Sequence, residues 1–346
     1  MLDWLYQLIG TMLYWFSSLF GGQYVFGLLL YALLFKLLFL PFSIKQQKNQ
    51  IKMAELTPKI ELIKAKYKGR TDQVTMQKQQ QEIMEFQQKE GYNPMAGCLP
   101  MLLQFPIIIF LYDIIRGPLS YIGRFTKEEI ATMRTALELG ENAVEFDIIN
   151  KINSIGINNL PEEIADFHER LSALPEFKLF GTNLLENPSF QSWTILIPVI
   201  AAALTWLSMY LSRKWNTNPN MMQNDEATNS SLKMMDLMMP GMTLFMAYGF
   251  QSLMGIYWIY QSALGILQTF IISRAMPLPK FSEEDVKEFK KAQKDAEKNA
   301  RTAAKNAPKV RSLHYIDDDD YDTLPEIEGS DKNDKNNSGQ MDMPEI

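Results

Sequence analysis

The sequence has few of the residues that enzymes and metal sites use most. Its 346 residues include one cysteine, Cys98, and two histidines, His168 and His314. One cysteine excludes an internal disulfide and a metal site built from cysteines alone. No apolar segment carries an H-E-x-x-H pair or a Ser–His arrangement, and no G-x-x-x-x-G-K-[ST] phosphate loop is present. We therefore expect no enzyme activity, no cofactor and no metal.

Long apolar runs are the main feature that is present. They cover residues 24–44, 97–117, 192–212, 234–250 and 253–273. A helix needs about 20 apolar residues to cross a bilayer. The fold class predicted is therefore all-α, a polytopic membrane protein with five transmembrane helices.

The distribution of lysine and arginine predicts the orientation. Residues 45–93 carry ten basic residues and residues 274–311 carry eleven, whereas residues 1–24 carry none. Residues 117–191 carry six basic residues against twelve acidic ones. Because basic residues collect in cytoplasmic segments, the N-terminus is predicted outside and the C-terminus in the cytoplasm.

The first 22 residues lack the basic start and the cleavage site of a signal peptide, and they predict an outer interfacial amphipathic helix instead. Tryptophans at Trp4 and Trp15 suit anchoring in the interface. A sixth, short span is the alternative. The polar stripe at helical spacing consists of Asp3, Gln7, Thr11 and Ser18.

Four further segments surround or interrupt the core of residues 23–275. Residues 45–93 predict a cytoplasmic helical hairpin, with Thr57 capping its first helix and Asp72 its second. Residues 118–191 predict a small extracytoplasmic helical insertion whose role the sequence leaves open. A basic cytoplasmic tail is expected over 276–311. Residues 312–346 carry a net charge of −9 and should be disordered.

Lys36 is the one charge in the first span and lies near its middle. A cation at that depth costs about 2.5–3.5 kcal/mol, so the ammonium needs water, a counter-charge or carbonyl groups. Snorkelling is the alternative. Eight residues separate Lys36 from Lys45, a rise of roughly 12–13 Å, which exceeds the reach of one lysine. We therefore expect a polar cavity beside this span.

Acidic pairs inside the membrane are not expected. Asp113 lies near the outer end of its span and Asp236 near the inner end of another. Arg116 follows Asp113 by three residues, a spacing that permits a local ion pair.

Neutral polar residues in the other spans are predicted to line a hydrated groove together with Lys36. The alternative for each is an ordinary interhelical hydrogen bond. A small-solute or ion transporter with Lys36 as ligand is a second functional hypothesis, although the five unequal spans lack the internal symmetry of most coupled transporters. The polar residues are Gln104, Thr205, Ser208, Gln251, Gln261, Ser262, Gln268 and Thr269.

Residues 93–112, NPMAGCLPMLLQFPIIIFLY, resemble the second core span of the YidC, Oxa and Alb family of membrane protein insertases, in which N-P, G-C-L-P and Q-x-P occur in this order. The resemblance extends over residues 20–117 and 192–275. Its other motifs are Lys36 with Pro41, the M-x-P at 238–240, and Gly255, Tyr257 and Trp258 followed by Gln268.

This resemblance implies an insertase and chaperone of the short Gram-positive type in a bacterial plasma membrane. Such proteins insert and help to fold newly made membrane proteins, alone or with the Sec translocon, through a hydrophilic groove. The groove residue that is usually arginine is Lys36 here, and Ser208 stands where a glutamine is usual. The groove is predicted to contain Lys36, Gln104, Thr205, Ser208, Trp258 and Gln261.

The expected partners are nascent membrane proteins, the lipid bilayer, the Sec translocon, and the ribosome through the basic tail or the hairpin. Methionine-rich surfaces adapt to many sequences, which suits contact with client helices, although lipid-facing filler is the alternative. The client contacts are predicted at Met101, Phe105, Met238 and Met242.

The orientation can be tested by thiol labelling. In a Cys98→Ser background, single cysteines at Ser154 and Ser282 should react with a membrane-impermeant maleimide from the outside and from the inside respectively. Reaction of both positions from one face would contradict the predicted topology.

Overall fold

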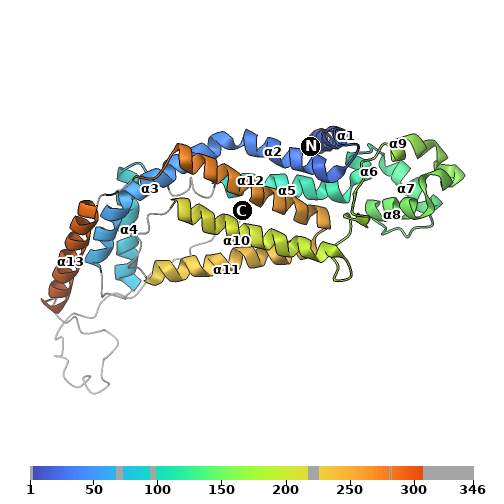
Figure 1. Ribbon diagram of the computed structural model, residues 1–346. Coiled ribbons are helices and arrows are strands. Elements are labelled where there is room, and N and C mark those ends of the chain that lie inside the picture. Colours follow the sequence, from blue (N-terminus) through green and yellow to red (C-terminus); the bar gives the residue numbers. More distant parts are fainter. Residues whose placement is uncertain are drawn as a thin grey trace, which may run out of the picture. The chain divides into compact units, whose positions relative to one another are not determined.

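The structure is a computed structural model that describes residues 3–67, 73–93, 99–216, 226–279, 281 and 283–306. The described chain is mostly helical (Figure 1). It divides into residues 1–300 and 301–346, and only the end of the last helix represents the second unit. Residues 312–346, predicted to be disordered, lie outside the described part.

The first apolar run forms two helices, α2 (Tyr24–Leu38) and α3 (Leu40–Lys66), which meet at an angle of 53°. Pro41 lies in the first turn of α3, where its missing N–H and its ring disfavour continuation of the preceding helix. The helix start predicted at Thr57 is wrong. Thr57 lies within α3 and donates from Oγ1 to the Met53 carbonyl at 2.8 Å.

Four more helices match the other apolar runs. They are α5 (Leu99–Arg116), α10 (Leu196–Asn216), α11 (Glu226–Gly249) and α12 (Ser252–Ala275). A short 3₁₀ turn, η4 (Trp193–Ile195), precedes α10. Within the described residues, Trp193–Asn216 and Ser252–Ala275 are long and apolar enough to span a membrane, and the bent pair of α2 and α3 is a third candidate. The count of five spans remains a prediction.

The helix α12 lies at the centre of the bundle and contacts α2, α10 and α11 (Figure 1). We call the end of the bundle that adjoins residues 117–195 the cap end, and the opposite end, where α3 leaves α2, the α3 end. Buried side chains concentrate toward the cap end, where they include Tyr24, Leu28, Tyr31, Leu111, Ile114, Leu253 and Tyr257. The bundle is therefore tightly packed toward the cap and looser toward α3.

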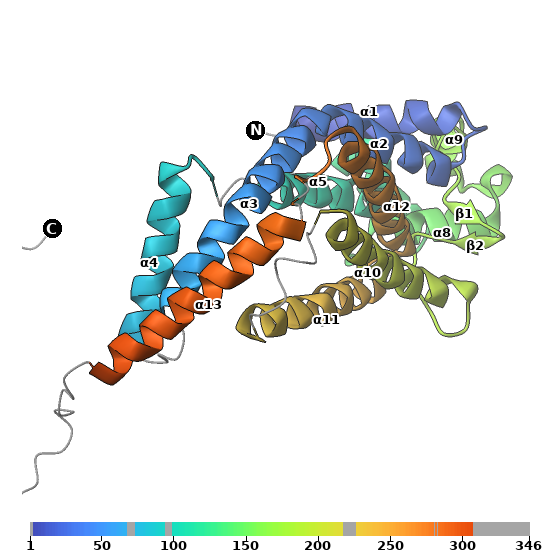
Figure 2. The same cartoon turned by 60° about the vertical axis from the view of Figure 1, so that its left-hand side comes forward.

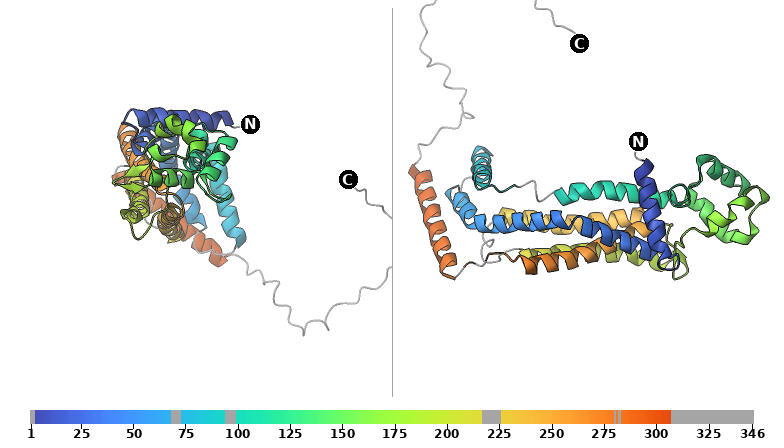
Figure 3. Two further views of the ribbon diagram at one scale, coloured as in Figure 1. Left: turned by 90° about the vertical axis from the view of Figure 1, so that its right-hand side faces the viewer. Right: turned by 90° about the horizontal axis from the view of Figure 1, so that it is seen from above.

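The N-terminal helix α1 (Asp3–Ser18) crosses α2 instead of running beside it (Figure 3). The two helices approach closely because Gly27 has no side chain, and a Cβ there would collide with Ser17. Trp4 and Trp15 are exposed on the other side of α1. This placement agrees with the helix expected at an interface, although its membrane contact remains a prediction.

The ion pair expected between Asp113 and Arg116 is not formed. Asp113 accepts a hydrogen bond from the Tyr6 hydroxyl of α1 at 2.7 Å. Arg116 donates to the Tyr112 hydroxyl at 3.2 Å and lies over that ring. The packing of α1 on α5 therefore supplies a partner that local spacing did not predict.

Beyond the bundle, α3 contacts α4 (Gln73–Lys89). Glu82 of α4 accepts hydrogen bonds from Lys66 Nζ at 2.7 Å and from the Tyr67 hydroxyl at 2.6 Å, and these bonds lower the pKa of its carboxyl group. The helix N-cap predicted at Asp72 lies outside the described residues. The basic tail forms α13 (Glu283–Asn306).

Residues 117–195 form a small cap of short helices and one hairpin (Figure 2). The two-stranded hairpin is a departure from the predicted all-α fold. The elements are α6 (Pro118–Tyr121), α7 (Lys127–Ala136), α8 (Glu145–Ile155), η2 (Ile157–Asn159), η3 (Glu162–Phe167), α9 (His168–Ser172), β1 (Lys178–Leu179) and β2 (Thr182–Asn183).

Arg170 of α9 joins three parts of this cap. Its Nη1 donates to Glu129 Oε1 at 2.6 Å, and its Nη2 donates to the Arg124 carbonyl at 2.7 Å. The guanidinium also lies 3.9 Å from the centre of the Phe125 ring. Arg170 lowers the pKa of Glu129, which also belongs to the capping box that starts α7.

Removal of this charge should loosen the cap. Arg170→Met should reduce the free energy of local opening at α7 by about 1–2 kcal/mol, because carbonyl and carboxylate partners lose a charged donor. Hydrogen exchange of the α7 amides, corrected for intrinsic rates, measures this change. The exposed Lys127→Met is the matched control.

The same bond should make the cap sensitive to acid. The pKa of Glu129 is lowered on folding. Its carboxylate therefore stabilises the cap fully above the ordinary value of 4.5, and this stabilisation is lost as the pH falls through the lowered pKa. Glu129→Gln should remove this loss. An unchanged acid dependence in Glu129→Gln would show that other carboxyl groups control it.

Candidate functional site

A polar pocket lies beside Lys36 inside the helical bundle. Its smaller part, of about 70 Å³, is enclosed by α2, α3, α5 and α12. Apolar rings and polar groups share its wall, so it combines a charge with several neutral hydrogen-bonding groups. The lining residues are Phe35, Lys36, Phe39, Phe42, Ser43, Gln104, Gln261 and Gln268.

A larger part, of about 410 Å³, adjoins it and shares Lys36, Ser43 and Gln268 with it. This part extends between α3, α10 and α12 toward the α3 end of the bundle. Polar side chains predominate in its lining. They are Gln46, Gln47, Gln50, Ser208, Ser212, Arg213, Asn216 and Thr269, together with Met209, Gly265 and Ile272.

The space around the Lys36 ammonium depends on a glycine of α12. A Cβ added at Gly265 would lie 3.5 Å from Lys36 Nζ and 4.0 Å from Ser208 Oγ. Within the part of the chain that the structure describes, no carboxylate forms an ion pair with Lys36. The groups that surround this charge in the described structure are therefore neutral and polar.

Hydrogen bonds hold the neutral groups of the pocket in place. Gln104 of α5 and Gln261 of α12 both donate to the Tyr257 hydroxyl, at 2.7 and 3.0 Å. Gln268 donates to Ser43 Oγ at 3.2 Å and joins α12 to α3. The amides thus connect three helices around the charged residue.

Two glutamines of α3, Gln47 and Gln50, line the larger part, and each has a buried polar group. Gln47 Nε2 donates to Asn216 Oδ1 at 2.9 Å and to the Met276 carbonyl at 3.0 Å. The Gln50 amide oxygen is buried and has no hydrogen-bond partner among the described residues. Such an oxygen favours water in a polar pocket, because an unpaired buried acceptor is unfavourable.

The structure brings together four of the six residues predicted for the groove. Lys36, Gln104, Ser208 and Gln261 line the two parts of the pocket. Thr205 bonds Ser262 at 3.3 Å instead, which is the interhelical alternative. Trp258 packs against the apolar core, with its ring 6.0 Å from that of Phe250. None of these roles has been tested, so all remain predictions.

The residues predicted to contact client helices are exposed where their side chains are described. Phe105 of α5 and both Met238 and Met242 of α11 are each half exposed or more. The side chain of Met101 lies outside the described residues. Arg213 at the rim of the pocket forms an ion pair with Asp236, which ties α10 to the methionine-rich helix α11.

Sequence reasoning missed the contribution of α3 to the site. The sequence directly after Pro41 has a polar pattern at helical spacing that indicates one face of a helix. It consists of Ser43, Gln46, Gln47 and Gln50. The predicted helix start at Thr57 leaves these residues before the helix, so the prediction does not include them.

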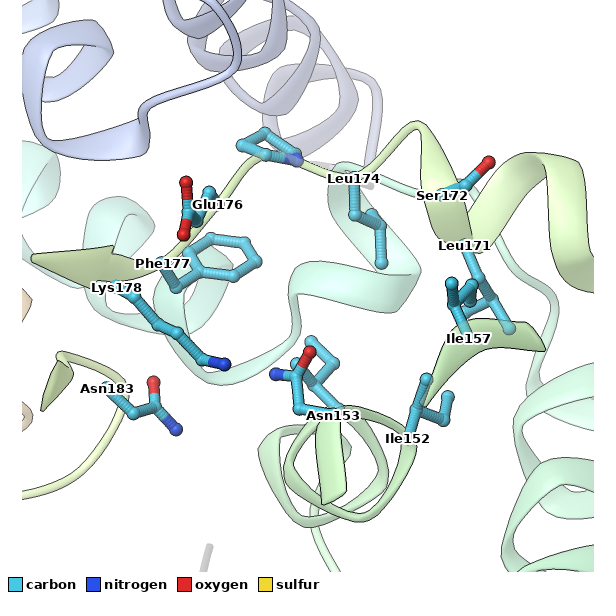
Figure 4. A pocket seen from close by; sticks show the side chains of 12 residues that line it. Ile152, Asn153, Ile157, Leu171, Ser172, Leu174, Glu176, Phe177, Lys178 and Asn183 are labelled. Carbon is cyan, nitrogen blue, oxygen red and sulfur yellow. The ribbon is translucent and has the colours of Figure 1, made fainter. Parts of the chain in front are cut away.

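A separate cavity of about 290 Å³ lies in the cap and shares no lining residue with the pocket (Figure 4). Isoleucine and leucine side chains of α8 and α9 form one wall, together with Phe177. Lys178 and Asn153 extend toward each other at its rim in Figure 4. The cavity belongs to the insertion and is distant in sequence from Lys36.

Comparison with known proteins identifies the family. Residues 15–280 match the family described as 60Kd inner membrane protein. Membrane protein insertase YidC 1 of Halalkalibacterium halodurans is 31% identical over 78% of this chain and 76% of its own. Membrane protein insertase YidC 1 of Listeria monocytogenes is 30% identical over 75% and 67%. Membrane protein insertase MisCA of Bacillus subtilis is 28% identical over 74% and 72%.

The chain belongs to the 60Kd inner membrane protein family, which is the YidC, Oxa and Alb family that its motifs resemble. This membership confirms the resemblance, and with the apolar helices it supports a bacterial membrane protein. The family is one of membrane insertases and is not a known class of enzyme.

The water content of the pocket can be tested at Ser208. In a Cys98→Ser background, Ser208→Cys should react with a water-soluble maleimide, whereas Val199→Cys on the exposed face of α10 should not in a bilayer. Gly265→Leu should slow the reaction at position 208 several-fold, because its side chain fills the space beside Lys36. Gly265→Ala should change it little, since its Cβ makes only ordinary contacts.

Proposed function

We propose that this protein is a membrane protein insertase and chaperone whose polar pocket around Lys36 is the hydrophilic groove. The family and its relatives named insertases support this function. The observation that carries the proposal is a cation that forms no ion pair with any described residue and lies inside an apolar bundle, in a pocket that extends toward one end. A translocated client segment would enter this pocket.

The physical argument concerns the penalty for moving polar groups into lipid. A hydrophilic client segment that enters the pocket finds amide, hydroxyl and ammonium groups instead of hydrocarbon, which lowers that penalty. The adjoining apolar client helix can meanwhile pack on the exposed side chains of α5 and α11. Its transfer into lipid is favourable by about 25 cal/mol per Å² of apolar surface, so no nucleotide is needed.

The unequal apolar runs disfavour the transporter hypothesis, because many coupled transporters are built from internal repeats. A coupled transporter opens its site alternately to both sides of the membrane. Here the helices are tightly packed at the cap end, where Leu28, Leu111 and Leu253 are fully buried. Among the described residues, the pocket extends toward the α3 end, so a segment could enter it part of the way from that end.

We further propose five transmembrane helices, with the N-terminus outside and α3, α4 and α13 in the cytoplasm. The basic residues that bracket the α3 end support this orientation. Exposed lysines of α13 would attract ribosomal RNA, and the Sec translocon would serve as a second partner for some clients. The exposed basic residues described in α13 are Lys287, Lys290, Lys291, Lys294, Lys298 and Arg301.

Site-specific photo-crosslinking tests the function directly. A photoreactive residue at Gln104 or Met242 should crosslink to a stalled nascent membrane protein, and one at the cap residue Ser154 should not. Saturable flux of a small solute, with no crosslink at either position, would overturn the insertase proposal in favour of a transporter.

The charge of Lys36 should matter most for acidic clients. Opposite charges about 5 Å apart attract by about 3 kcal/mol at an effective dielectric constant of about 20, and desolvation offsets part of this. We expect Lys36→Leu to slow insertion of a client with an acidic translocated segment by about tenfold, equivalent to about 1.4 kcal/mol. Lys36→Arg should retain the rate.

Insertion into vesicles, with protease protection of the translocated segment, measures this effect. Lys48→Leu, at an exposed position of α3, is the matched control and should have the normal rate. A normal rate for Lys36→Leu with the acidic client would remove the electrostatic role and leave the groove as a neutral polar surface.

A further inference from the structure

The β1–β2 hairpin of the cap presents an aromatic side chain at its tip. Pairing of Leu179 with Thr182 leaves Phe180 and Gly181 as a two-residue turn, with φ of 50° and 76°. Hairpin turns with two positive φ angles favour asparagine, aspartate or glycine. Phe180 is instead 85% exposed in a backbone conformation that is unfavourable for a bulky residue.

The position of this tip is fixed by contacts with the start of α10. The Phe180 ring meets the Trp193 ring edge-on, with 5.7 Å between centres. Trp193 Nε1 donates to Thr182 Oγ1 at 2.8 Å, which ties the indole to the hairpin. Trp193 is also the first residue of the candidate span Trp193–Asn216, so the tip lies level with the end of that span.

A second exposed ring of the cap adjoins the end of another helix. Phe190 is 80% exposed and lies 5.9 Å from the ring of Tyr248, one residue before the end of α11. Phe180 and Phe190 therefore lie beside the cap ends of α10 and α11. Aromatic residues are enriched at this level, where a bilayer meets water.

We propose that the β1–β2 hairpin anchors the cap to the bilayer, with Phe180 inserted into the outer leaflet and Phe190 as a second lipid contact. We name the outer leaflet as the contact because the two rings lie beside the cap ends of α10 and α11, where a bilayer spanned by α10 would have its surface. Burial of the ring in lipid compensates for its unfavourable backbone conformation. This anchor requires α10 to span the bilayer but does not depend on insertase activity.

Collision measurements on nitroxide-labelled protein test the anchor. Single cysteines at Phe180, Phe190 and Ser154 are introduced in the Cys98→Ser background, and the protein is placed in vesicles of phosphatidylethanolamine and phosphatidylglycerol. Labels at 180 and 190 should collide more with oxygen than with a water-soluble nickel chelate, and the exposed position 154 should show the reverse. Equal nickel accessibility at 180 and 154 would overturn the proposal.

A second variant separates anchoring from folding. Phe180→Asn suits the turn better than the native residue, so the hairpin should remain folded while its lipid contact is lost. Trypsin cleavage after Lys178 should then be several-fold faster than in the wild type in vesicles but equal to it in detergent. Equal rates in vesicles would show that a protein contact, not the bilayer, holds the hairpin.

Discussion

The lone ammonium of Lys36 is the constraint on which the site depends. A charge in an apolar span must be solvated, and no described carboxylate pairs with it. Solvation therefore depends on hydroxyl and amide groups contributed by four other helices, α3, α5, α10 and α12, and on the space beside Gly265. Replacing any one of them by a larger apolar group would raise the free energy of the charged state, which is why the polar groups gather in one place.

The bend between α2 and α3 determines the shape of that polar region. A straight helix would carry the residues after Pro41 along the direction of α2. The 53° turn instead leaves Ser43, Gln47 and Gln50 in the wall of the larger pocket, opposite Ser212 and Asn216 of α10. The bent pair of α2 and α3 thus supplies both the charge and much of its polar surroundings.

Prediction from the sequence succeeded for those helix positions and pocket residues that depend on local composition. Apolar runs gave the positions of α5, α10 and α12 to within four residues, and polar residues inside them predicted Gln104, Ser208 and Gln261 at the pocket. The prediction failed for contacts in which one partner comes from a segment distant in the sequence. The partner of Asp113 comes from α1, and Thr182 of β2 accepts a hydrogen bond from Trp193 at the start of the next long helix.

If the pocket is the proposed groove, the difference in packing between the two ends of the bundle accounts for the entry of polar segments from one end only. At the cap end, Leu28, Leu111 and Leu253 are fully buried between the described helices. At the α3 end, amides and the ammonium line an open pocket. A hydrophilic segment is stabilised only as far as the polar lining extends. In that case its further movement across the membrane would be driven by transfer of the attached apolar helix into lipid, because that transfer is the favourable step that remains.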